Sequence, residues 1–420
     1  MRVIHTSDWH LGQTLRGFDR TREHQVFLDW LLLTLVESAA DALLIAGDIF
    51  DQANPSAEAQ AQFYHFLADA RRRLPRLDVV AIAGNHDSPG RLEAPRRLLK
   101  DFGIHVAGHC NLQNDLSGTP GDAVLDRLLA PLRDAGGEIA AWVLTVPFLR
   151  PGDLRDGSGL GYQDALRAVY RRLADAALER CRNGEALLAM GHLHVQGGIV
   201  SELSERRLII GGEEAVDAGV FPAEAAYVAL GHLHRPQAVA GRPDIRYAGS
   251  PLPLSFPEEE HSHHVLQVDL DGGTAVTTPL PTPRAVELLR LPAEPLPLEQ
   301  VLQELAAYPF TPSARGIWPL LEVRIREAIL PVQFRQRLEE VLDGKSVHLA
   351  RIDRSKPALP APVTGGAPSA PEGPDVRRLD PAQVFARRLD DEGELPDRAE
   401  LEGAFAELLD QALQTQGGRA

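Results

Sequence analysis

The first 280 residues alternate short apolar runs with segments whose apolar residues recur at helical spacing. Such runs, several of them followed directly by glycine, are typical of buried strands. They lie at residues 3–4, 42–46, 79–83, 141–148, 186–190, 227–230 and 264–270. Helices are predicted over residues 20–38 and 56–73, the second starting at Ser56, a candidate N-cap after Pro55. Strands and helices alternate first and strands dominate later, which predicts a layered α/β sandwich over residues 1–280.

A smaller pattern of the same kind follows a proline-rich stretch at residues 281–297, which we interpret as a hinge. The predicted order is helix, strand, helix, strand, at residues 298–307, 320–326, 332–342 and 346–352. This predicts a compact α+β domain over residues 281–354 that caps the first.

Residues 355–376 are rich in proline, alanine and glycine and predict a disordered linker. Beyond it, amphipathic helices are predicted at residues 381–389 and 399–413, where Leu401, Phe405 and Leu408 share one face. A short helix after a flexible linker has no local core to pack on. We therefore interpret residues 377–416 as a helical segment that docks on a partner, the alternative being that it folds back on its own body.

Composition narrows the class of protein further. The 420 residues contain no apolar stretch long enough to cross a membrane, and the start lacks the pattern of a secretory signal. Two cysteines, Cys110 and Cys181, cannot build a disulfide framework or a four-thiolate zinc site. We expect a protein of a reducing bacterial cytoplasm, associated with the nucleoid.

Charge argues against nonspecific binding of nucleic acid by the chain as a whole. The formal net charge is −16, and phosphate contacts depend on positive charge. Residues 1–100, however, carry 12 basic and 13 acidic side chains, so they are close to neutral.

One arrangement recurs along the chain: an apolar strand runs into glycine or serine and then into aspartate, asparagine or histidine. The instances are SDWH at 7–10, AGD at 46–48, AGNHD at 83–87, MGHLH at 190–194 and LGHLH at 230–234. Ligands bind at the carboxyl ends of strands in open α/β sheets, so these side chains are expected to converge. Carboxylate, amide and imidazole donors without thiolate suit manganese, iron or zinc. Seven such donors exceed the need of one ion but fit two ions bridged by a carboxylate, the arrangement that serves phosphoryl transfer.

In this order the motifs are specific, and the chain resembles the calcineurin-like metallophosphoesterases. The matching stretches are SDWHLG, AGDIFD, GNHDSPGR, GHLHRPQ and YAGSPLPLSFPE. The resemblance implies a β-sandwich flanked by helices, and it is closest to the branch of nuclease subunits in DNA-end-processing and repair complexes. It implies a manganese-dependent, ATP-regulated 3′–5′ double-strand exonuclease and single-strand endonuclease, with magnesium as a possible replacement.

The resemblance assigns roles to individual residues. It implies first-metal ligands Asp8, His10 and His234, a bridging Asp48, and second-metal ligands Asn85, His192 and His232. His86 would stand off the metals and act on the substrate, stabilising charge or protonating the leaving oxygen, and Asp87 would orient it by a hydrogen bond. A water activated by the two cations would be the nucleophile.

Other polar residues have a simpler interpretation. His5 is expected to pack in the core, His194 to be structural although it could replace His192 as a ligand, and Asp51 to cap a loop rather than turn back to the site. The histidines at 261, 263 and 264 are expected on a solvated loop, with adventitious metal binding as the alternative. Contacts to DNA phosphates are predicted for Arg16 and Arg91, with Arg20 and Arg22 as further candidates.

The resemblance also implies partners. A nuclease subunit of this branch works with an ABC-class ATPase that has long coiled coils, and this chain has no phosphate-binding GxxxxGK[ST] loop of its own. A homodimer within a 2:2 complex is expected through helices at 57–73 and 91–102, with candidate contacts at Phe63, Phe66, Leu67, Leu98 and Leu99 unless these simply pack in the core. The rival functions are a phosphatase or cyclic-nucleotide phosphodiesterase for a small substrate, and a scaffold that kept the fold without activity.

Overall fold

The computed structural model describes residues 1–110, 122–154, 160–182, 184–200, 215–239, 241–312, 316–327 and 330–355, together with Arg398 and Phe405. The chain divides into two units, residues 1–357 and 358–420. The predicted linker and docking segment lie outside the described residues, apart from Ser355, Arg398 and Phe405.

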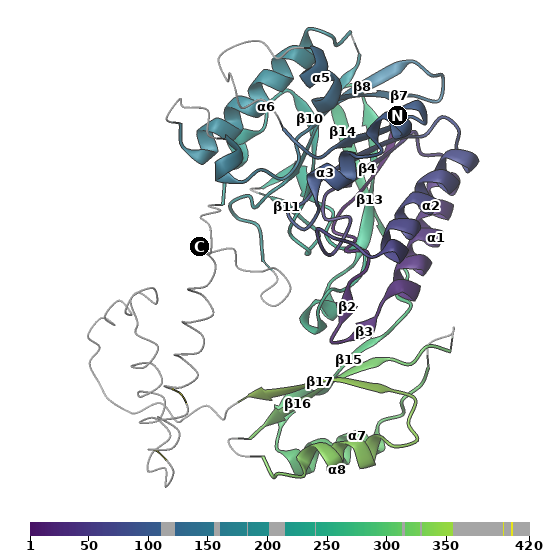
Figure 1. Cartoon of the computed structure of the whole chain (residues 1–420), viewed down its shortest axis with the longest axis vertical. Coiled ribbons are helices and arrows are strands. Elements are labelled where there is room, and N and C mark those ends of the chain that lie inside the picture. Colours follow the sequence, from purple (N-terminus) through teal and green to yellow (C-terminus); the bar gives the residue numbers. More distant parts are fainter. Residues whose placement is uncertain are drawn as a thin grey trace. The chain divides into compact units, whose positions relative to one another are not determined.

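Two six-stranded mixed sheets form the larger part of the first unit (Figure 1). The first has the order β14-β13-β1-β4-β5-β6, with β1 Arg2–Thr6, β4 Ala42–Ala46, β5 Asp78–Ile82, β6 Ile104–Ala107, β13 His264–Asp271 and β14 Thr274–Pro281. The second has the order β11-β12-β10-β9-β8-β7, with β7 Leu129–Arg133, β8 Ile139–Thr145, β9 Ala186–His192, β10 Ala225–Gly231, β11 Gln237–Val239 and β12 Arg242–Tyr247. Each sheet contains four consecutive parallel strands, β1-β4-β5-β6 and β8-β9-β10-β12.

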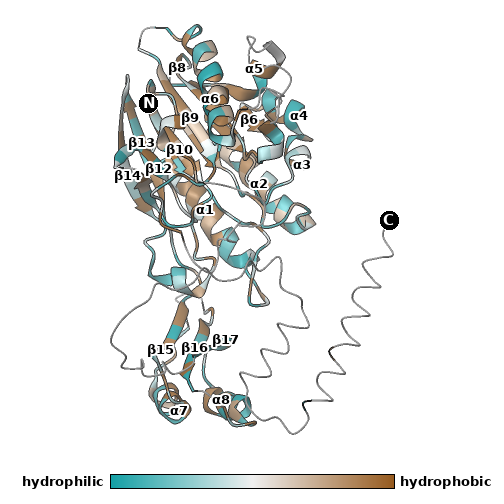
Figure 2. Ribbon diagram, turned by 90° about the vertical axis from the view of Figure 1, so that its left-hand side faces the viewer, coloured by the Kyte–Doolittle hydropathy of each residue, from teal (hydrophilic) through white to brown (hydrophobic). Residues whose placement is uncertain are grey.

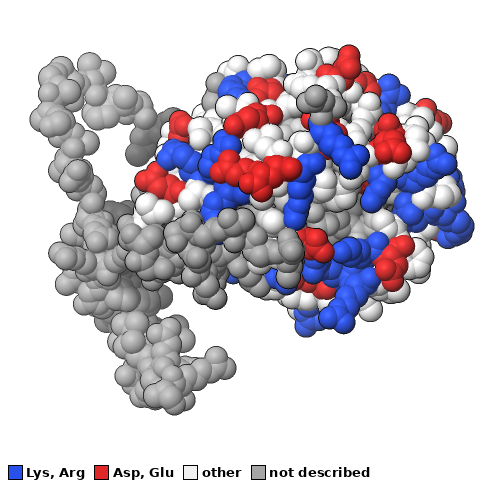
Figure 3. Space-filling model, turned by 90° about the horizontal axis from the view of Figure 1, so that it is seen from above, with Lys and Arg blue, Asp and Glu red and all other residues white. Residues whose placement is uncertain are grey.

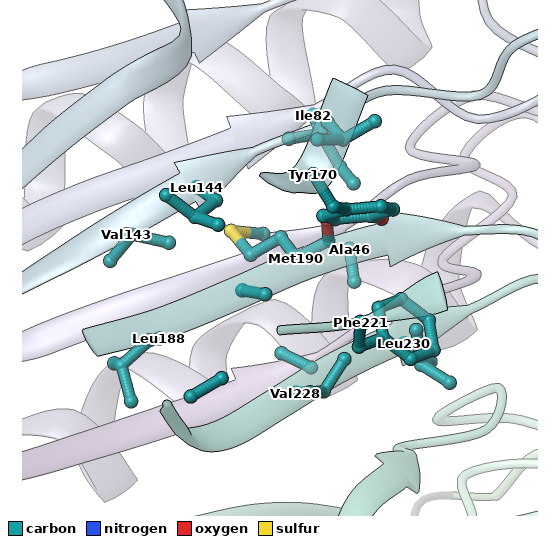
Figure 4. Packing of buried hydrophobic residues seen from close by; sticks show 14 of the residues in the cluster. Ala46, Ile82, Val143, Leu144, Tyr170, Leu188, Met190, Phe221, Val228 and Leu230 are labelled. Carbon is teal, nitrogen blue, oxygen red and sulfur yellow. The ribbon is translucent and has the colours of Figure 1, made fainter. Parts of the chain in front are cut away.

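The apolar core between the sheets explains why the strand sequences are apolar on both faces. Ala46 and Ile82 of the first sheet belong to the same buried cluster as Leu144, Leu188 and Met190 of the second (Figure 4). β4 lies against both β9 and β10. The layered α/β sandwich predicted from the strand pattern, and the β-sandwich that the family resemblance implies, are therefore confirmed.

Helices cover the sandwich on its outer faces. α1 Thr21–Glu37 and α2 Ala57–Arg73 bury their apolar stripes on the first sheet, and α6 Tyr162–Leu178 packs against β8 and β9 of the second, so that polar residues remain outside (Figure 2). The predicted N-cap of α2 is confirmed, because the Ala59 N–H donates to Ser56 Oγ at 3.1 Å. Shorter helices are α3 Pro89–Glu93, α4 Arg96–Asp101 and α5 Asp122–Leu128, and a small hairpin is formed by β2 Thr14–Leu15 and β3 Phe18–Asp19.

Most of the side chains expected at a dimer interface belong to this core. Phe63, Phe66 and Leu67 of α2 and Leu99 of α4 are buried, and all four belong to the cluster that α1 and α2 form with the first sheet. Leu98, in contrast, is 63% exposed. Core packing therefore explains four of the five candidates.

The remaining strands form a separate three-stranded parallel sheet with two helices. It comprises β15 Leu288–Leu296, β16 Leu320–Arg326 and β17 His348–Ser355, with α7 Leu298–Ala307 and α8 Phe334–Leu342 packed on one face. The prediction of a hinge at 281–297 is wrong, because most of this segment is β15. Prolines are tolerated there because β15 is an edge strand, and its pairing with β16 is interrupted between Leu291 and Leu296.

A membrane-spanning helix is not found among the described residues, since none of their helices is both long and apolar enough. The prediction from sequence is the same.

Candidate metal centre and its cleft

Strand ends from both sheets deliver the candidate ligands. Asp8 and His10 follow β1, Asp48 follows β4, Asn85 follows β5, and the remaining candidates end or follow β9 and β10. Because these strands are parallel within each sheet, their carboxyl ends lie at one edge. This placement agrees with the prediction from sequence that the candidate ligand side chains converge at the carboxyl ends of the strands.

The turns at this edge hold the backbone in conformations that few residues adopt. Asp8, His10 and Asp48 have positive φ of 53°, 47° and 47°, and His232 has φ of 102°. A side chain at Gly231 would lie 2.0 Å from the Ala46 carbonyl oxygen, so glycine is required where the two sheets meet. Strained backbone of this kind persists where the surrounding structure fixes it, and it concentrates at functional sites.

Three overlapping groups of side chains bring their potential ligand atoms within 4.8 Å of one another. They are Asp8 with His10 and His234, His10 with Asp48 and His86, and Asp8 with Asp48 and His192. Asp8, His10 and Asp48 each belong to two groups, and all three are buried. Two neighbouring positions for cations, rather than one, follow from this overlap.

The amide of Asn85 lies beside the group formed by Asp8, Asp48 and His192. Its Oδ1 lies 3.0 Å from His192 Nε2 and 3.0 Å from His232 Nδ1. His192 Nε2 in turn lies 3.4 Å from Asp48 Oδ2. Ligand atoms at right angles around a divalent ion of about 2.1 Å bond length are about 3 Å apart, so this spacing fits such an ion.

One ring nitrogen of His10 also indicates a bound ion. His10 Nε2 is buried and makes no hydrogen bond in the part of the chain that the structure describes. A buried polar atom without a partner is costly unless an ion or water satisfies it. The donor set and this orphaned imidazole together fit a pair of divalent cations.

The pKa values of the side chains at the site are shifted because carboxylates and imidazoles are buried there next to one another. Burial opposes a charge on His192, but Asp48 and Asp8 outweigh it and raise the pKa of His192 to about 9. Burial, followed by the neighbouring His192, holds the pKa of His232 well below its usual value. Burial likewise raises the pKa of Asp8. The site is therefore a network of strongly interacting charges.

His86 lies beside the cluster, with its ring fixed by the main chain. Its Nδ1 is 2.8 Å from the carbonyl oxygen of Asp51, so Nδ1–H donates and Nε2 stays available. The His86 backbone N–H donates to Asp48 Oδ1 at 2.8 Å. The ring meets that of His10 edge-on, at a centroid distance of 4.9 Å.

Asp87 does not orient His86, contrary to the sequence prediction. Its buried carboxylate accepts the backbone N–H groups of Gly84, Phe50 and Ile49 at 2.9, 2.9 and 3.2 Å. The carboxylate faces the loops that carry Asp48 and Asn85 and ties them together.

Two carboxylates behind the histidines were not predicted as part of the site. Asp51 was expected to cap a loop, but its Oδ1 lies 3.3 Å from His10 Nδ1. Glu258 is fully buried, and its Oε1 lies 3.3 Å from His234 Nδ1. Asp51 stands three residues after Asp48 and was therefore a weak candidate, whereas Glu258 is 24 residues from His234 and carries no signal of its own.

The other histidines lie elsewhere. His5 is buried with Nδ1 2.9 Å from the Tyr227 hydroxyl, which confirms its core role. His194 is half-buried and belongs to none of the metal-capable groups found among the described residues. The expected solvated loop is wrong for His263 and His264, which are buried; both His263 ring nitrogens face backbone carbonyls, those of Ser250 and Glu258.

A cleft of about 430 Å³ opens beside the cluster. Its lining includes His10, His86 and His234 together with Arg16 from the turn of the β2–β3 hairpin. Arg91 is exposed in α3 but is not among the lining residues. Arg20 is no candidate for a phosphate contact, because it is fully buried and its guanidinium pairs with both oxygens of Glu23.

Basic and acidic side chains alternate over the face shown in Figure 3, with basic ones gathered toward its right-hand edge. In the sequence of the helices, the last turn of α2 contains three basic residues, Arg71, Arg72 and Arg73. Among them, Arg71 donates to the Leu77 carbonyl and Arg72 pairs with Asp69. This arrangement is that of a solvated helix end, so positive charge near the cleft comes from single arginines such as Arg16.

Known proteins resemble the chain over both parts. Residues 1–236 match the calcineurin-like phosphoesterase family, and residues 284–393 match the type 5 capsule protein repressor C-terminal domain. A protein of Rhodobacter capsulatus, named as the D subunit of the nuclease SbcCD, is 42% identical over 92% of this chain and 94% of its own length. Proteins of the same name from Escherichia coli K12 and Bacillus subtilis are 31% and 36% identical, over 93% and 66% of this chain and 92% and 68% of their own lengths.

Proposed function

The chain belongs to the calcineurin-like phosphoesterases and, within them, to the family of SbcCD nuclease D subunits, and on that premise we propose that it hydrolyses phosphodiester bonds in DNA with two manganese ions. The specific activities that we propose are 3′–5′ exonuclease on duplex ends and endonuclease on single strands. The observation that carries the proposal is the placement of His86, whose Nδ1 faces the Asp51 carbonyl oxygen at 2.8 Å and whose ring adjoins His10 and Asp48. His10 and Asp48 are shared with the two other groups of metal-capable side chains.

We assign the metal ligands by which potential donor atoms lie close to one another. The first metal would be held by Asp8, His10 and His234, the second by Asn85, His192 and His232, and Asp48 would bridge the two. When bound, the two cations supply Lewis-acid activation of water and of the phosphate. Oxygen and imidazole donors suit Mn²⁺, and Mg²⁺ is the expected substitute.

His86 would act on the substrate rather than on the metals. With Nδ1–H donated to the Asp51 carbonyl, Nε2 is the atom that faces a phosphate in the cleft. In its protonated form Nε2–H stabilises the negative charge that develops on the phosphate and gives its proton to the departing oxygen. Arg16 on the cleft wall would bind a neighbouring phosphate and hold the strand in register.

The net charge of −16 does not contradict a nucleic-acid substrate. Two divalent cations at the cleft neutralise phosphate charge locally, and a partner can supply the extended basic surface. We propose an SbcC-type ABC ATPase with coiled coils as this partner, docked by residues 377–416, with residues 281–354 acting as a cap domain beside the nuclease domain. The relatives are named as one part of a complex, SbcCD, and this name supports the partner.

We further propose a homodimer within that complex, formed where α2 meets α4. An apolar cavity of about 610 Å³ lies there, lined by Tyr64, Leu67, Leu98, Leu99 and Phe102 among others. Leu98 and Phe102 are 63% and 51% exposed, an unusual state for two large apolar side chains that neighbour each other. A second copy of the same surface would cover both.

The alternative is a phosphatase or cyclic-nucleotide phosphodiesterase with the same fold and metals. Digestion of an end-labelled linear duplex in the presence of manganese, compared with turnover of a chromogenic phosphodiester and monoester, separates the two functions. We expect duplex digestion that needs manganese, is lost in His86→Ala and rises with the ATPase partner and ATP. Preference for the monoester, or full activity of His86→Ala, would contradict the proposal. Asp134→Ala, in an exposed turn, is the matched control.

A further inference from the structure

The histidines of the two proposed metal positions differ in what lies behind their rings. Behind His234 stands Glu258, whose Oε1 is 3.3 Å from Nδ1. The Glu258 side chain has no exposed surface, and its other oxygen accepts the backbone N–H of Leu254 at 2.7 Å. The carboxylate is therefore fixed, and it accepts Nδ1–H of His234 so that Nε2 is left as the ligand atom.

The second imidazole at the first position has a similar neighbour. Asp51 Oδ1 lies 3.3 Å from His10 Nδ1, and the Asp51 side chain is 23% exposed. Together with the ligand Asp8 and the bridging Asp48, two further carboxylates therefore surround the first position.

The second position has no such support among the described residues. His192 donates Nδ1–H to a neutral group, the carbonyl oxygen of Ala46, at 2.9 Å. His232 presents Nδ1 itself to the position, beside the Asn85 amide. No described carboxylate lies within hydrogen-bonding distance of either ring from behind, and Asp48 is the single carboxylate assigned to this position as a ligand.

This asymmetry has a consequence for cation binding. A carboxylate that accepts the N–H of a ligating histidine increases the basicity of the opposite nitrogen and fixes the ring, and its loss typically weakens metal binding by about 10–100-fold. Buried negative charge also attracts a divalent cation directly. Buried negative charge from Asp8 and Asp48 reaches both positions. Among the described residues, a carboxylate behind a ligating histidine is found only at the first position.

We propose that the chain binds its two divalent cations in order, the position of Asp8, His10 and His234 filling first, and that Glu258 is the positioning residue that sets this order. The inference rests on the proposed two-metal function and deepens it. The second cation is then the exchangeable one, and its supply controls whether the cluster is complete.

Titration of the metal-free full-length protein with Mn²⁺ in a calorimeter tests the order, and electron paramagnetic resonance at one and two equivalents reports which form is present. We expect two binding events whose dissociation constants differ at least about tenfold, and an uncoupled Mn²⁺ signal at one equivalent. Glu258→Gln should weaken the first event by about 10–100-fold and leave the second nearly unchanged. Glu260→Gln, at an exposed glutamate two residues away, should change neither.

Two further variants distinguish a role of Glu258 in cation binding from a general loss of structure at the site. Asp51→Asn alters the other supporting carboxylate in a partly exposed position and should also weaken the first event alone. Asn85→Ala should weaken the second alone. Two events of equal affinity in the wild type, or an equal loss in both events for Glu258→Gln, would overturn the proposal. Because these readouts need no DNA, ordered binding without DNA cleavage would reject the proposed function and leave this inference standing.

Discussion

Removing the carboxylate of Asp87 tests how the loops of the site are held. The side chain is 4% exposed and accepts the N–H groups of Gly84, Phe50 and Ile49 at 2.9–3.2 Å. These amides belong to the loops that follow β5 and β4, so Asp87→Ala leaves three buried donors unpaired at the base of the metal site.

The expected cost follows from the number of donors and their burial. An unpaired buried donor costs about 1–3 kcal/mol, so three cost at least about 3 kcal/mol. Burial, and then the neighbouring Asp48, raise the pKa of Asp87 to about 6. Burying the negative charge of Asp87 is therefore unfavourable, and the three hydrogen bonds supply the stabilisation. We therefore expect the lower end, about 3 kcal/mol, which is a large share of the roughly 5–15 kcal/mol typical of a folded protein.

Urea unfolding at pH 7.5 measures this loss, with Asp134→Ala as the matched control. Asp134 Oδ1 also accepts two backbone N–H groups, those of Gly136 and Glu138, but in an exposed turn between β7 and β8 where water replaces it. The control should lose less than about 1 kcal/mol. If Asp87→Ala cost no more than Asp134→Ala, the argument that this carboxylate holds the two loops together would be refuted.

Three further outcomes are expected. Leu98→Glu should shift the protein from dimer to monomer in sedimentation without lowering its melting temperature, because the side chain is 63% exposed; an unchanged dimer would contradict the proposed interface. Burial lowers the pKa of His105 to about 4 although Nε2–H donates to the Arg127 carbonyl. His105 therefore contributes stability above pH 6.5 that is lost as the pH falls through 4, and His105→Gln should lessen the drop in urea-unfolding free energy between pH 7 and pH 4 by about 3 kcal/mol. Mn²⁺ at 100 times its dissociation constant should stabilise the wild type by about 2.7 kcal/mol. His10→Leu should lose that gain in thermal unfolding and His24→Leu should keep it. Each histidine has a buried Nε2 that makes no hydrogen bond among the described residues, so equal behaviour would exclude a special role for His10.

The strands and helices that carry the site were predictable because each combines a regular spacing of apolar residues with a residue that marks where the element begins or ends. The run at 42–46 became β4 with the same bounds, and Ser56 caps α2 as expected, the helix itself beginning at Ala57. The strand β15 within residues 281–297 could not be predicted, because prolines indicate a break in the chain's regular structure unless the edge position of the strand is known. Edge position is a property of the assembled sheet, and no local pattern encodes it.

The candidate ligands could be named from sequence because each lies at or just after the end of a strand. The buried carboxylates that hold the ligands or their loops in place could not. Asp87 adjoins His86 in the chain, and its carboxylate nevertheless serves backbone amides in another loop. Glu258 reaches His234 from a separate turn. Sequence adjacency indicates where a backbone goes, whereas the partner of a buried carboxylate depends on the folded path of both segments.

The division of the site between two sheets determines what a bound cation can stabilise. His192 ends β9 of the second sheet, yet its Nδ1–H donates to the Ala46 carbonyl of the first, and its Nε2 lies 3.4 Å from Asp48 on that same sheet. Gly231 lies so close to the Ala46 carbonyl that no side chain fits between them. A cation held by donors from both sheets therefore resists their separation, and its binding energy is added to the stability of the whole sandwich rather than to one loop. Loss of metal should accordingly lower the cooperative unfolding transition of residues in both sheets together.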